Sequence, residues 1–383
     1  MPILTTSASG RKLRVLLVLH ELGPGAPSVP LVALSHLRRE IRVHTVAPVA
    51  GRRSLEGQYR ALGPLSLQPP WSTSLVHRAV RRVVLQKQRM EITRFDPDII
   101  YVNSVQALEV ARNANVPERP VVLHVHELGS YLEPLLSDQR VRLCEWPTKY
   151  VAVSEAVRRY LIDRGAISDD RVAMIHAFLA DEFLSRAAGP AASATPSPRR
   201  LVVGGAGAPT WRKGIQLWLE LAAALRELLP ADWTVAFRWV GMADSTEAEV
   251  ARFHARRLKV DDIVSFVPYT NSPKAEFEMF DLFAMTSWED PCPLVVLENM
   301  ALEKPILCFA AGGGAAEQVG EAGVVIPAFE PKLMAAAAAE LALDPARRLR
   351  LGAAARERVK TTFTASIQAP KLLRELRACA NRP

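Results

Sequence analysis

The residues best placed to do chemistry lie between Thr286 and Glu317. In this stretch Asp290 and Glu298 stand eight positions apart, across the change from a loop to a helix that begins with proline. Carboxylates at such a junction can accept hydrogen bonds from sugar hydroxyls, while the N–H groups at the start of the helix can bind a phosphate. The stretch therefore indicates a site for a nucleotide sugar.

A second set of candidate residues surrounds a glycine-rich turn. The run 204–207, which includes Gly205, follows a predicted strand, and Arg212 and Lys213 precede a predicted helix over residues 215–228. Glycines let the backbone approach a ligand closely, and a lysine at a helix start adds positive charge where a diphosphate could bind. A plain turn with two solvated cations would carry the same residues. Both interpretations stay open on the sequence alone.

Two His-Glu pairs occur where predicted strands end. His126 and Glu127 follow a predicted strand that ends at Val125, and His20 and Glu21 follow the first predicted strand of the chain. Open parallel sheets bind their ligands at the carboxyl ends of the strands. We therefore interpret His126 as a residue that faces a ligand, with a structural histidine as the alternative. For His20 and Glu21, contact with an acceptor and simple packing are equally good explanations.

Short apolar runs separated by helix-length segments make up most of the chain. A parallel sheet produces this alternation, because each strand is buried on both faces and a helix connects it to the next strand. The predicted strands cover residues 15–19, 42–46, 98–102, 120–125, 149–153, 200–203, 234–240, 263–267, 282–285 and 305–309. We predict the α/β fold class, with two Rossmann-like domains that each contain a parallel sheet.

The length of the chain also favours two domains. Its 383 residues exceed what one hydrophobic core usually serves. The segment 187–200 is small, polar and rich in proline, which is typical of a linker. We therefore place a first domain at residues 1–180, a linker at 181–200, a second domain at 201–362 and a final helix at 363–383.

The acidic pair and the glycine turn resemble the signature of glycosyltransferase family 4, whose retaining enzymes have the GT-B fold of two facing Rossmann-like domains. The family spaces two acids with seven residues between them, as Asp290 and Glu298 are spaced, and follows them with a turn similar to Gly-Gly-Ala-Ala-Glu at 313–317. The first acid of the family is usually glutamate. Either Asp290 or the neighbouring Glu289 is therefore expected to meet the donor sugar.

The resemblance implies a retaining, metal-independent glycosyltransferase of the hexosyltransferase type. The nucleotide sugar would be a substrate, and no cofactor would be needed. Residues 1–180 would form the acceptor side, residues 201–362 would bind the nucleotide sugar, and the helix at 363–383 would pack back on the first domain. The acceptor would be a glycan, a glycolipid or another lipid-linked sugar, or a small-molecule glycoside, such as occur in polysaccharide biosynthesis.

The resemblance also assigns roles to individual residues. Lys213 would contact the diphosphate, with Arg212 in place of an arginine that the family carries a few positions earlier. Pro293 has no N–H to donate, so other amides at that helix start would bind the phosphate. The catalytic candidates are His126, Asp290, Glu289 and Lys213. The candidates for binding the nucleotide sugar are Gly205, Arg212, Lys213, Leu294, Val295 and Glu298, the last through the ribose hydroxyls.

A formal net charge of +8 suits an anionic partner. No zinc-ligand spacing or RNA-binding aromatic signature accompanies the arginines, so we exclude nucleic acid. In a predicted helix over 75–94, Val76, Val80, Val83 and Met90 share one face, and several arginines lie opposite. This helix either rests on anionic lipid or presents a solvated basic face over a packed core.

The remaining features concern location and competing functions. The cysteines are far apart in the sequence and indicate reduced thiols: Cys144, Cys292, Cys308 and Cys379. No apolar run is long enough for a signal peptide or a membrane span, which predicts a cytoplasmic protein, with peripheral contact at the inner face of the membrane as an option. A GT-B nucleotide-sugar epimerase and a glycan-binding scaffold with a degenerate site are the alternative functions.

Overall fold

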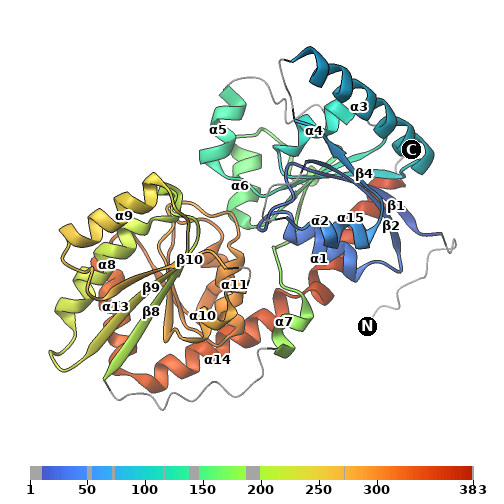
Figure 1. Cartoon of the computed structure of the whole chain (residues 1–383). Coiled ribbons are helices and arrows are strands. Elements are labelled where there is room, and N and C mark those ends of the chain that lie inside the picture. The colour runs from blue at the N-terminus through green and yellow to red at the C-terminus, as the bar shows by residue number, and fades with distance from the viewer. Residues whose placement is uncertain are drawn as a thin grey trace, which may run out of the picture.

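The computed structural model describes residues 11–49, 54–70, 74–114, 118–137, 146–186, 199–270 and 272–381. These residues form two α/β domains, each built on a parallel sheet that is flanked by helices (Figure 1). The first sheet has seven strands and the second has six. The predicted fold class is confirmed.

The first sheet has the strand order β3-β2-β1-β4-β5-β6-β7. Its strands are β1 (Leu13–Leu19), β2 (Ile41–Pro48), β3 (Leu65–Gln68), β4 (Ile99–Asn103), β5 (Val121–Val125), β6 (Lys149–Ala152) and β7 (Val172–Met174). Val15, Leu17 and Leu19 of β1 pack into one layer of the core, whereas Leu16 and Val18 pack into the layer on the other face. Burial on both faces explains why β1 has a continuous apolar sequence.

Seven α-helices precede the second sheet in the described part of the chain. They are α1 (Ser28–His36), α2 (Glu56–Leu62), α3 (Leu75–Phe95), α4 (Ala107–Ala114), α5 (Gly129–Ser137), α6 (Glu155–Asp163) and α7 (Asp181–Arg186), and a 3₁₀ turn covers Asp169–Arg171. α1 and α4 pack on opposite faces of the first sheet, since their buried residues belong to different layers of the core.

α3 differs from what its sequence pattern predicts. The face that carries Val76, Val80, Val83 and Met90 is open to solvent, and these side chains are between 53% and 72% exposed. The helix instead packs on the domain through residues such as Ile92, which is buried in the core. The interpretation that the valines form a packed core beneath a basic face is therefore wrong.

The second sheet has the strand order β10-β9-β8-β11-β12-β13. Its strands are β8 (Arg200–Ala206), β9 (Thr234–Met242), β10 (Val264–Pro268), β11 (Leu282–Met285), β12 (Ile306–Phe309) and β13 (Val324–Ile326). The helices of this domain are α8 (Ile215–Leu228), α9 (Thr246–Arg257), α10 (Lys274–Glu278), α11 (Leu294–Ala301), α12 (Ala315–Val319), α13 (Pro331–Leu343) and α14 (Pro345–Thr362), with 3₁₀ turns at Trp211–Lys213 and Gly320–Ala322.

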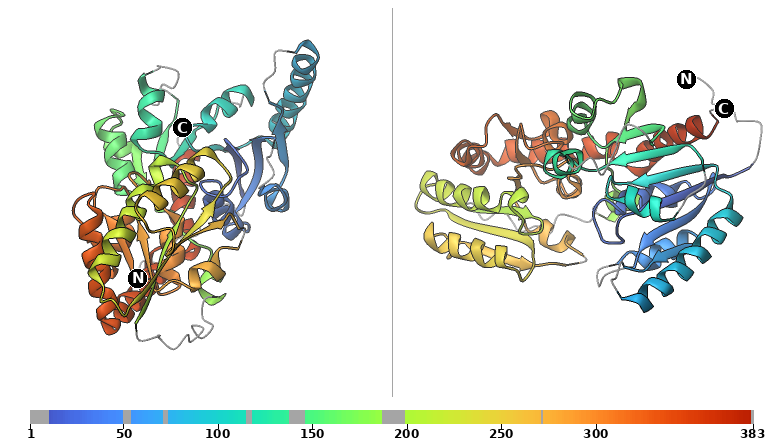
Figure 2. Two further views of the ribbon diagram at one scale, coloured as in Figure 1. Left: turned by 60° about the vertical axis from the view of Figure 1, so that its left-hand side comes forward. Right: turned by 90° about the horizontal axis from the view of Figure 1, so that it is seen from above.

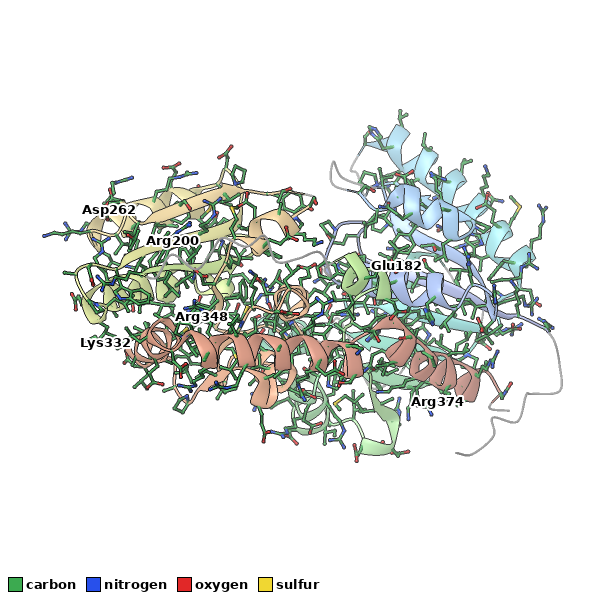
Figure 3. All side chains as sticks on the ribbon, turned by 90° about the horizontal axis from the view of Figure 1, so that it is seen from below. Glu182, Arg200, Asp262, Lys332, Arg348 and Arg374 are labelled. Atoms are coloured by element: carbon green, nitrogen blue, oxygen red, sulfur yellow. The ribbon has the colours of Figure 1, made fainter. Side chains whose placement is uncertain are left out.

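The last helix, α15 (Ala365–Ala380), returns to the first domain. Figure 3 shows α14, which carries Arg348, leading toward α15, which carries Arg374, along one side of the molecule. Leu372 and Leu376 of α15 are fully buried in the same core layer as α1. The helix therefore crosses back as the resemblance implies.

The structure adds three strands to those predicted. β3, β7 and β13 lie at edges of the two sheets and are only three or four residues long. Most of the predicted linker, residues 187–198, lies outside the described residues, as does Cys144. The predicted domain limits stay predictions. Across the described segments, no helix is both long enough and apolar enough to cross a membrane.

Candidate active site

A cavity of about 460 Å³ lies between the two domains. It is lined by residues that follow strands of both sheets: His126 follows β5, Lys213 lies between β8 and α8, and Asp290 lies between β11 and α11. Open parallel sheets bind ligands at this carboxyl edge. The cavity is therefore the candidate active site.

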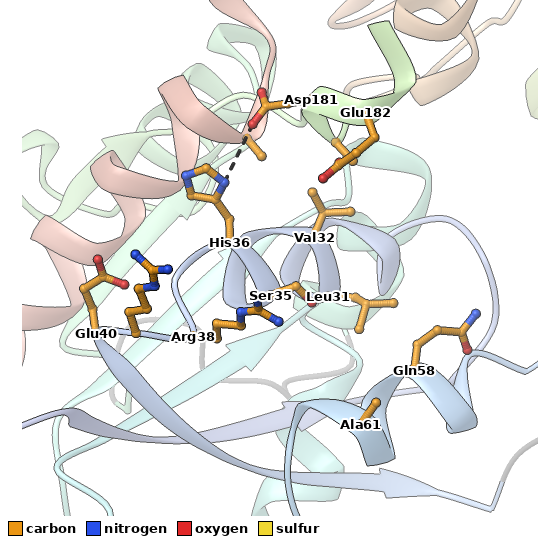
Figure 4. Close-up of a pocket in the computed structure, with 13 residues that line it drawn as sticks. Leu31, Val32, Ser35, His36, Arg38, Glu40, Gln58, Ala61, Asp181 and Glu182 are labelled. Carbon is orange, nitrogen blue, oxygen red and sulfur yellow. Dashed lines mark ion pairs between the residues drawn. The ribbon is translucent and has the colours of Figure 1, made fainter. Parts of the chain in front are cut away.

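A larger cavity of about 780 Å³ lies on the first domain (Figure 4). It surrounds the end of α1, where Nδ1 of His36 is 3.7 Å from a carboxylate oxygen of Asp181. None of the predicted site residues lines it. The beginning of α1 at Val29, in contrast, lines the cavity between the domains. The types of residue that line a cavity, and not the volume of the cavity, therefore identify the candidate site.

Lys213 and Asp290 form an ion pair inside the site. The Nζ atom of Lys213 is 2.5 Å from Oδ2 of Asp290, and the Asp290 residue is only 6% exposed. Arg212 lies beside this pair, with Nη1 4.0 Å from the same oxygen, and donates a 2.8 Å hydrogen bond to the backbone oxygen of Glu289. Two cations and one carboxylate thus meet on adjoining loops of the second domain.

Gly214 explains how Lys213 reaches this position. Its φ of 63° lies in the left-handed region, and a Cβ atom there would come within 2.0 Å of the backbone oxygen of Thr286. The Thr286 hydroxyl also donates a 3.0 Å hydrogen bond to the Gly214 oxygen. Glycine is needed because the loop that carries the lysine passes directly against the loop after β11.

The glycine turn before α12 holds the backbone of Asp290. The Asp290 N–H donates to the oxygen of Gly312 at 2.8 Å, and the Gly314 N–H donates to the Asp290 oxygen at 2.9 Å. Gly313 has a φ of 102°, and a Cβ atom there would lie 2.2 Å from the Asp290 oxygen. The glycines and the carboxylate of the motif are therefore parts of one structure, which fixes the aspartate at the cavity wall.

The two candidate carboxylates point to different partners. Glu289 accepts hydrogen bonds from the backbone N–H of Ser130 at 3.1 Å and from its hydroxyl at 2.5 Å, both at the start of α5 in the first domain. Asp290 lines the cavity, whereas Glu289 is not among the lining residues. The geometry favours Asp290 as the carboxylate beside a bound ligand, and it makes Glu289 a contact between the domains.

The start of α11 forms another part of the cavity wall. Pro293 precedes the helix, and Leu294 and Val295, its first two residues, line the cavity. The first N–H groups of a helix have no partner within the helix, so they can bind an anion. Cys292 also lines the cavity, and burial raises the pKa of its thiol well above the usual range.

His126 lies on the opposite wall. Its Nε2 atom is 2.8 Å from the side-chain oxygen of Asn103 at the end of β4. An amide oxygen only accepts, so Nε2 carries the proton and Nδ1 is left as an acceptor. Burial lowers the pKa of His126 well below its usual value, with His124 and His20 adding to the effect. The imidazole is therefore neutral and suited to hydrogen bonding.

Glu127 and His20 complete this wall. The buried carboxylate of Glu127 accepts from the hydroxyl of Ser104 and, at 2.9 Å, from the N–H of His126, while burial raises its pKa. Nε2 of His20 is 3.4 Å from Glu21, and Nδ1 has no hydrogen-bond partner among the described residues. Burial alone would lower the pKa of His20, but Glu21 and Glu127 raise it overall.

Besides Glu289, two more predicted site residues lie outside the lining of the cavity. Glu298, on α11, is half-buried, and burial raises the pKa of its carboxyl to about 7. At Gly205, a Cβ atom would lie 2.6 Å from the rings of Trp218 and Trp239, so packing explains this glycine. No group of three or more His, Cys, Asp or Glu side chains in the described part of the chain could hold a metal ion.

Sequence reasoning missed further contacts that join the domains beside the cavity. Glu317 accepts from the N–H of Glu155 at 2.7 Å and from Nε2 of His176 at 2.6 Å. Burial would raise the pKa of Glu317, but these contacts lower it overall. On the other side, the Arg212 guanidinium lies 5.6 Å from the ring centre of Tyr131. The one feature of the sequence that could have indicated these contacts is that Tyr131 and His176 come soon after the ends of β5 and β7.

Each of the two domains matches a known protein family. Residues 31–182 match the family described as Glycosyltransferase Family 4, and residues 197–344 match the family described as Glycosyl transferases group 1. An uncharacterized glycosyltransferase of Haemophilus influenzae is 31% identical over 107 residues, which is 28% of this chain and 29% of that protein. A D-inositol 3-phosphate glycosyltransferase of Kineococcus radiotolerans is 33% identical over 120 residues, 27% of either chain. These alignments thus span less than a third of each relative.

Solved structures resemble the chain over nearly its whole length. The Anabaena protein Alr3699/HepE in complex with UDP has a TM-score of 0.77 at 18% identity, over 96% of this chain and all of that one. WaaG, a glycosyltransferase involved in lipopolysaccharide biosynthesis, has a TM-score of 0.70 at 15% identity, over 95% of this chain and 99% of that one. At this level of identity, the similarity establishes the shared fold.

Proposed function

The chain belongs to the family 4-type glycosyltransferases with the GT-B fold, and from this premise we propose that it transfers a sugar from a nucleotide-sugar donor to an acceptor hydroxyl with retention of configuration. One observation carries the proposal. Lys213, Arg212, Asp290 and the start of α11 converge on one wall of the cavity, while His126 stands on the other. This combination offers positive charge to a diphosphate and acceptors to a sugar.

The ion pair of Lys213 and Asp290 supplies the first step of the mechanism. A bound diphosphate carries more negative charge than one carboxylate, so it competes for the ammonium group of Lys213. Asp290 then accepts hydrogen bonds from the hydroxyls of the donor sugar. When the donor binds, Lys213 thus exchanges Asp290 for the diphosphate, and Asp290 exchanges Lys213 for the sugar hydroxyls. Neither charge is left unpaired in the cavity.

The reaction itself needs charge stabilisation and positioning. The bond between the anomeric carbon and the diphosphate oxygen breaks, and the acceptor oxygen forms its bond on the same face. The proton of the acceptor hydroxyl passes to the leaving diphosphate, so no nucleophile of the enzyme takes part. Negative charge grows on the diphosphate as the sugar leaves, and Lys213, Arg212 and the N–H groups of Leu294 and Val295 stabilise it.

Further residues complete the donor site in this proposal. Glu298 holds the ribose hydroxyls as a carboxylate, and His126 orients the sugar through its acceptor nitrogen, Nδ1. Support for the donor class comes from Alr3699/HepE, which has been crystallised with UDP and with UDP-glucose. We propose a hexose as the sugar, a glycan, a glycolipid or a small-molecule glycoside as the acceptor, and no metal or cofactor.

A donor screen tests the proposal. The protein is mixed with UDP-, GDP-, ADP- and TDP-sugars, and the shift in melting temperature identifies the nucleotide that binds. The donor that binds is then incubated with and without acceptors, and free nucleotide and the anomeric proton of the product are followed by NMR. Transfer or slow donor hydrolysis with retention is expected. An epimerised donor, an inverted product or no turnover with any donor would contradict the proposal.

A further inference from the structure

The first turns of α3 stand away from the body of the first domain (Figure 2). Residues 76–80 are all exposed. The helix rests on the domain further along, where Gln88 is 2% exposed and Ile92 is 1% exposed. The first half of α3 is therefore available for contact with another surface.

An apolar stripe begins on this exposed part of α3 and continues along the helix to Met90. Val76, Val80, Val83 and Met90 are 72%, 53%, 66% and 59% exposed. At about 100° per residue these four side chains fall within about 80° of one another around the helix axis. Isolated exposed apolar residues are ordinary, but a row of four on one protruding helix is typical of a contact surface.

A row of arginines runs along a different face of the same helix, with its centre about 140° around the axis from the centre of the stripe. Arg78, Arg82 and Arg89 fall within about 40° of one another by the same helical geometry. Together with Arg81 they line a hollow of about 480 Å³, and none of the described residues that line it is acidic. Within the described residues, none of these four arginines forms an ion pair with a carboxylate. Their charge is therefore available to an anionic partner.

The position of α3 relates this surface to the active site. β3 ends at Gln68 and α3 begins at Leu75, so the helix starts on the side of the sheet where the strands have their carboxyl ends. The cavity between the domains lies at that same edge. The protruding turns of α3 therefore follow the same edge of the sheet as the residues that line the cleft.

We propose that the exposed turns of α3 bind an anionic lipid surface. The valines enter the boundary between headgroups and acyl chains, and the arginines pair with the lipid phosphates. The cleft of the first domain then opens beside the membrane surface, where a lipid-linked acceptor would be located. This last point rests on the proposed function, whereas the binding of lipid does not.

The apolar stripe distinguishes lipid from nucleic acid as the partner. Binding to a nucleic acid backbone needs the arginines alone, and contact with unpaired bases uses exposed aromatic rings. The stripe consists of valines and a methionine, which gain free energy only where they leave water. A lipid surface is the anionic partner that uses both rows of side chains.

Vesicle sedimentation with the full chain tests the proposal. The vesicles contain phosphatidylcholine alone or equal parts of phosphatidylcholine and phosphatidylglycerol. We expect binding to the anionic vesicles only, weakened by added salt. The triple variant Arg78→Glu, Arg82→Glu and Arg89→Glu should bind about 100-fold more weakly.

The matched control is Arg256→Glu, Arg257→Glu and Arg350→Glu, at exposed positions of the second domain. Three charge reversals remove six units, so both triple variants have a formal charge of 8 − 6 = +2. The control should bind like the native protein. Equal binding by the two variants would overturn the assignment of the surface to α3.

A second variant tests the apolar stripe separately. Val76→Ser, Val80→Ser and Val83→Ser keep the charge and should weaken binding to anionic vesicles about tenfold or more. Circular dichroism and nucleotide-induced melting shifts check that each variant is folded. Negligible binding of the native protein to anionic vesicles would overturn the proposal, as would binding to a short RNA or DNA duplex in its place. Donor hydrolysis is measured in parallel, so a failure of lipid binding is distinguishable from a failure of the proposed function.

Discussion

The two walls of the cavity between the domains carry different kinds of polar group. The wall from the second domain has the cations of Arg212 and Lys213 next to the carboxylate of Asp290. The wall from the first domain has His126 and Glu127, and burial lowers the pKa of the imidazole and raises that of the carboxyl. The second-domain wall, called the charged wall below, therefore presents charges. On the first-domain wall burial drives His126 and Glu127 toward neutral hydrogen-bonding groups, and we call it the neutral wall for these two residues, since His20 beside Glu21 has a raised pKa.

This difference suggests how a nucleotide sugar is oriented. The donor has the same asymmetry, with an anionic diphosphate at one end and a neutral sugar at the other. A diphosphate gains most from the wall with two cations and a helix start. The sugar then projects toward His126, whose neutral ring does not attract the diphosphate. In the proposed function the charged wall accelerates the reaction and the neutral wall positions the substrate.

The largest effect is expected from the charged wall. Lys213→Ala should lower kcat about 100- to 1000-fold, because negative charge on the diphosphate grows as the sugar leaves. Affinity for the free nucleotide should fall much less, and calorimetry beside steady-state kinetics separates the two quantities. Lys332→Ala, at an exposed position of α13, is the matched control. Normal kinetics in both Lys213→Ala and the double variant with Arg212→Ala would remove these residues from the reaction.

The next prediction separates the two neighbouring carboxylates. Asp290→Asn should lower kcat/KM about 100-fold, since it loses a charge-assisted hydrogen bond to the sugar. Glu289→Gln should cost only about fivefold, because an amide oxygen can still accept from Ser130 across the domain contact. Both values come from initial rates with the same donor. A larger loss for Glu289→Gln would reverse the assignment made from the geometry.

Glu298, on the helix whose first residues line the charged wall, provides a pH-dependent test of nucleotide binding. Its pKa is raised by burial from 4.5 to about 7, and ribose hydroxyls donate best to the ionised form. Nucleotide affinity should therefore rise as the pH increases through 7, with release of a proton on binding. Glu298→Gln should bind the nucleotide about tenfold more weakly at pH 8 and show a flat profile. Calorimetry in buffers of different ionisation enthalpy measures the proton release.

The same carboxyl affects stability with a defined sign. A folded-state pKa above the unfolded value means that the stabilising contribution of Glu298 is fully present below about pH 4.5 and is lost as the pH rises through about 7. The melting temperature of the ligand-free protein should fall over this range more than that of Glu298→Gln. If the melting temperatures of the two proteins changed with pH by the same amount, the pKa of Glu298 would not be raised.

The charged wall was largely predictable from the sequence, because its residues lie in two short motifs. Lys213 and Asp290 are each found by local spacing, and Gly214 and Gly313 mark the backbone positions that hold them. The same reasoning could not assign Gly205, since its neighbours Trp218 and Trp239 come from other elements. Glycine in a strand has the same sequence signal whether a ligand or an indole ring lies above it.

The neutral wall and the domain contacts were less predictable, since they depend on distant pairs. His126 meets Asn103 at the end of another strand, and Glu317 meets His176 after β7, a three-residue edge strand that periodicity does not detect. The central strands were found because burial on both faces leaves a continuous apolar run. For α3 the pattern was clear but did not reveal which face is exposed, because apolar periodicity identifies a stripe and not what covers it.

The smallest effect is expected from removal of divalent metal. In the proposed function, the positive charge required at the diphosphate comes from Lys213 and Arg212 and from the helix start at Leu294, so transfer should continue unchanged in EDTA. The measurement compares initial rates after dialysis against EDTA with rates after Mg²⁺ or Mn²⁺ is restored. If activity disappears in EDTA and returns with metal, the protein cations are not sufficient. The charged wall would then need a metal ion that binds together with the donor. Asp290 would be the first carboxylate to test as a ligand of that ion, because Asp290 would no longer need Lys213 as its partner.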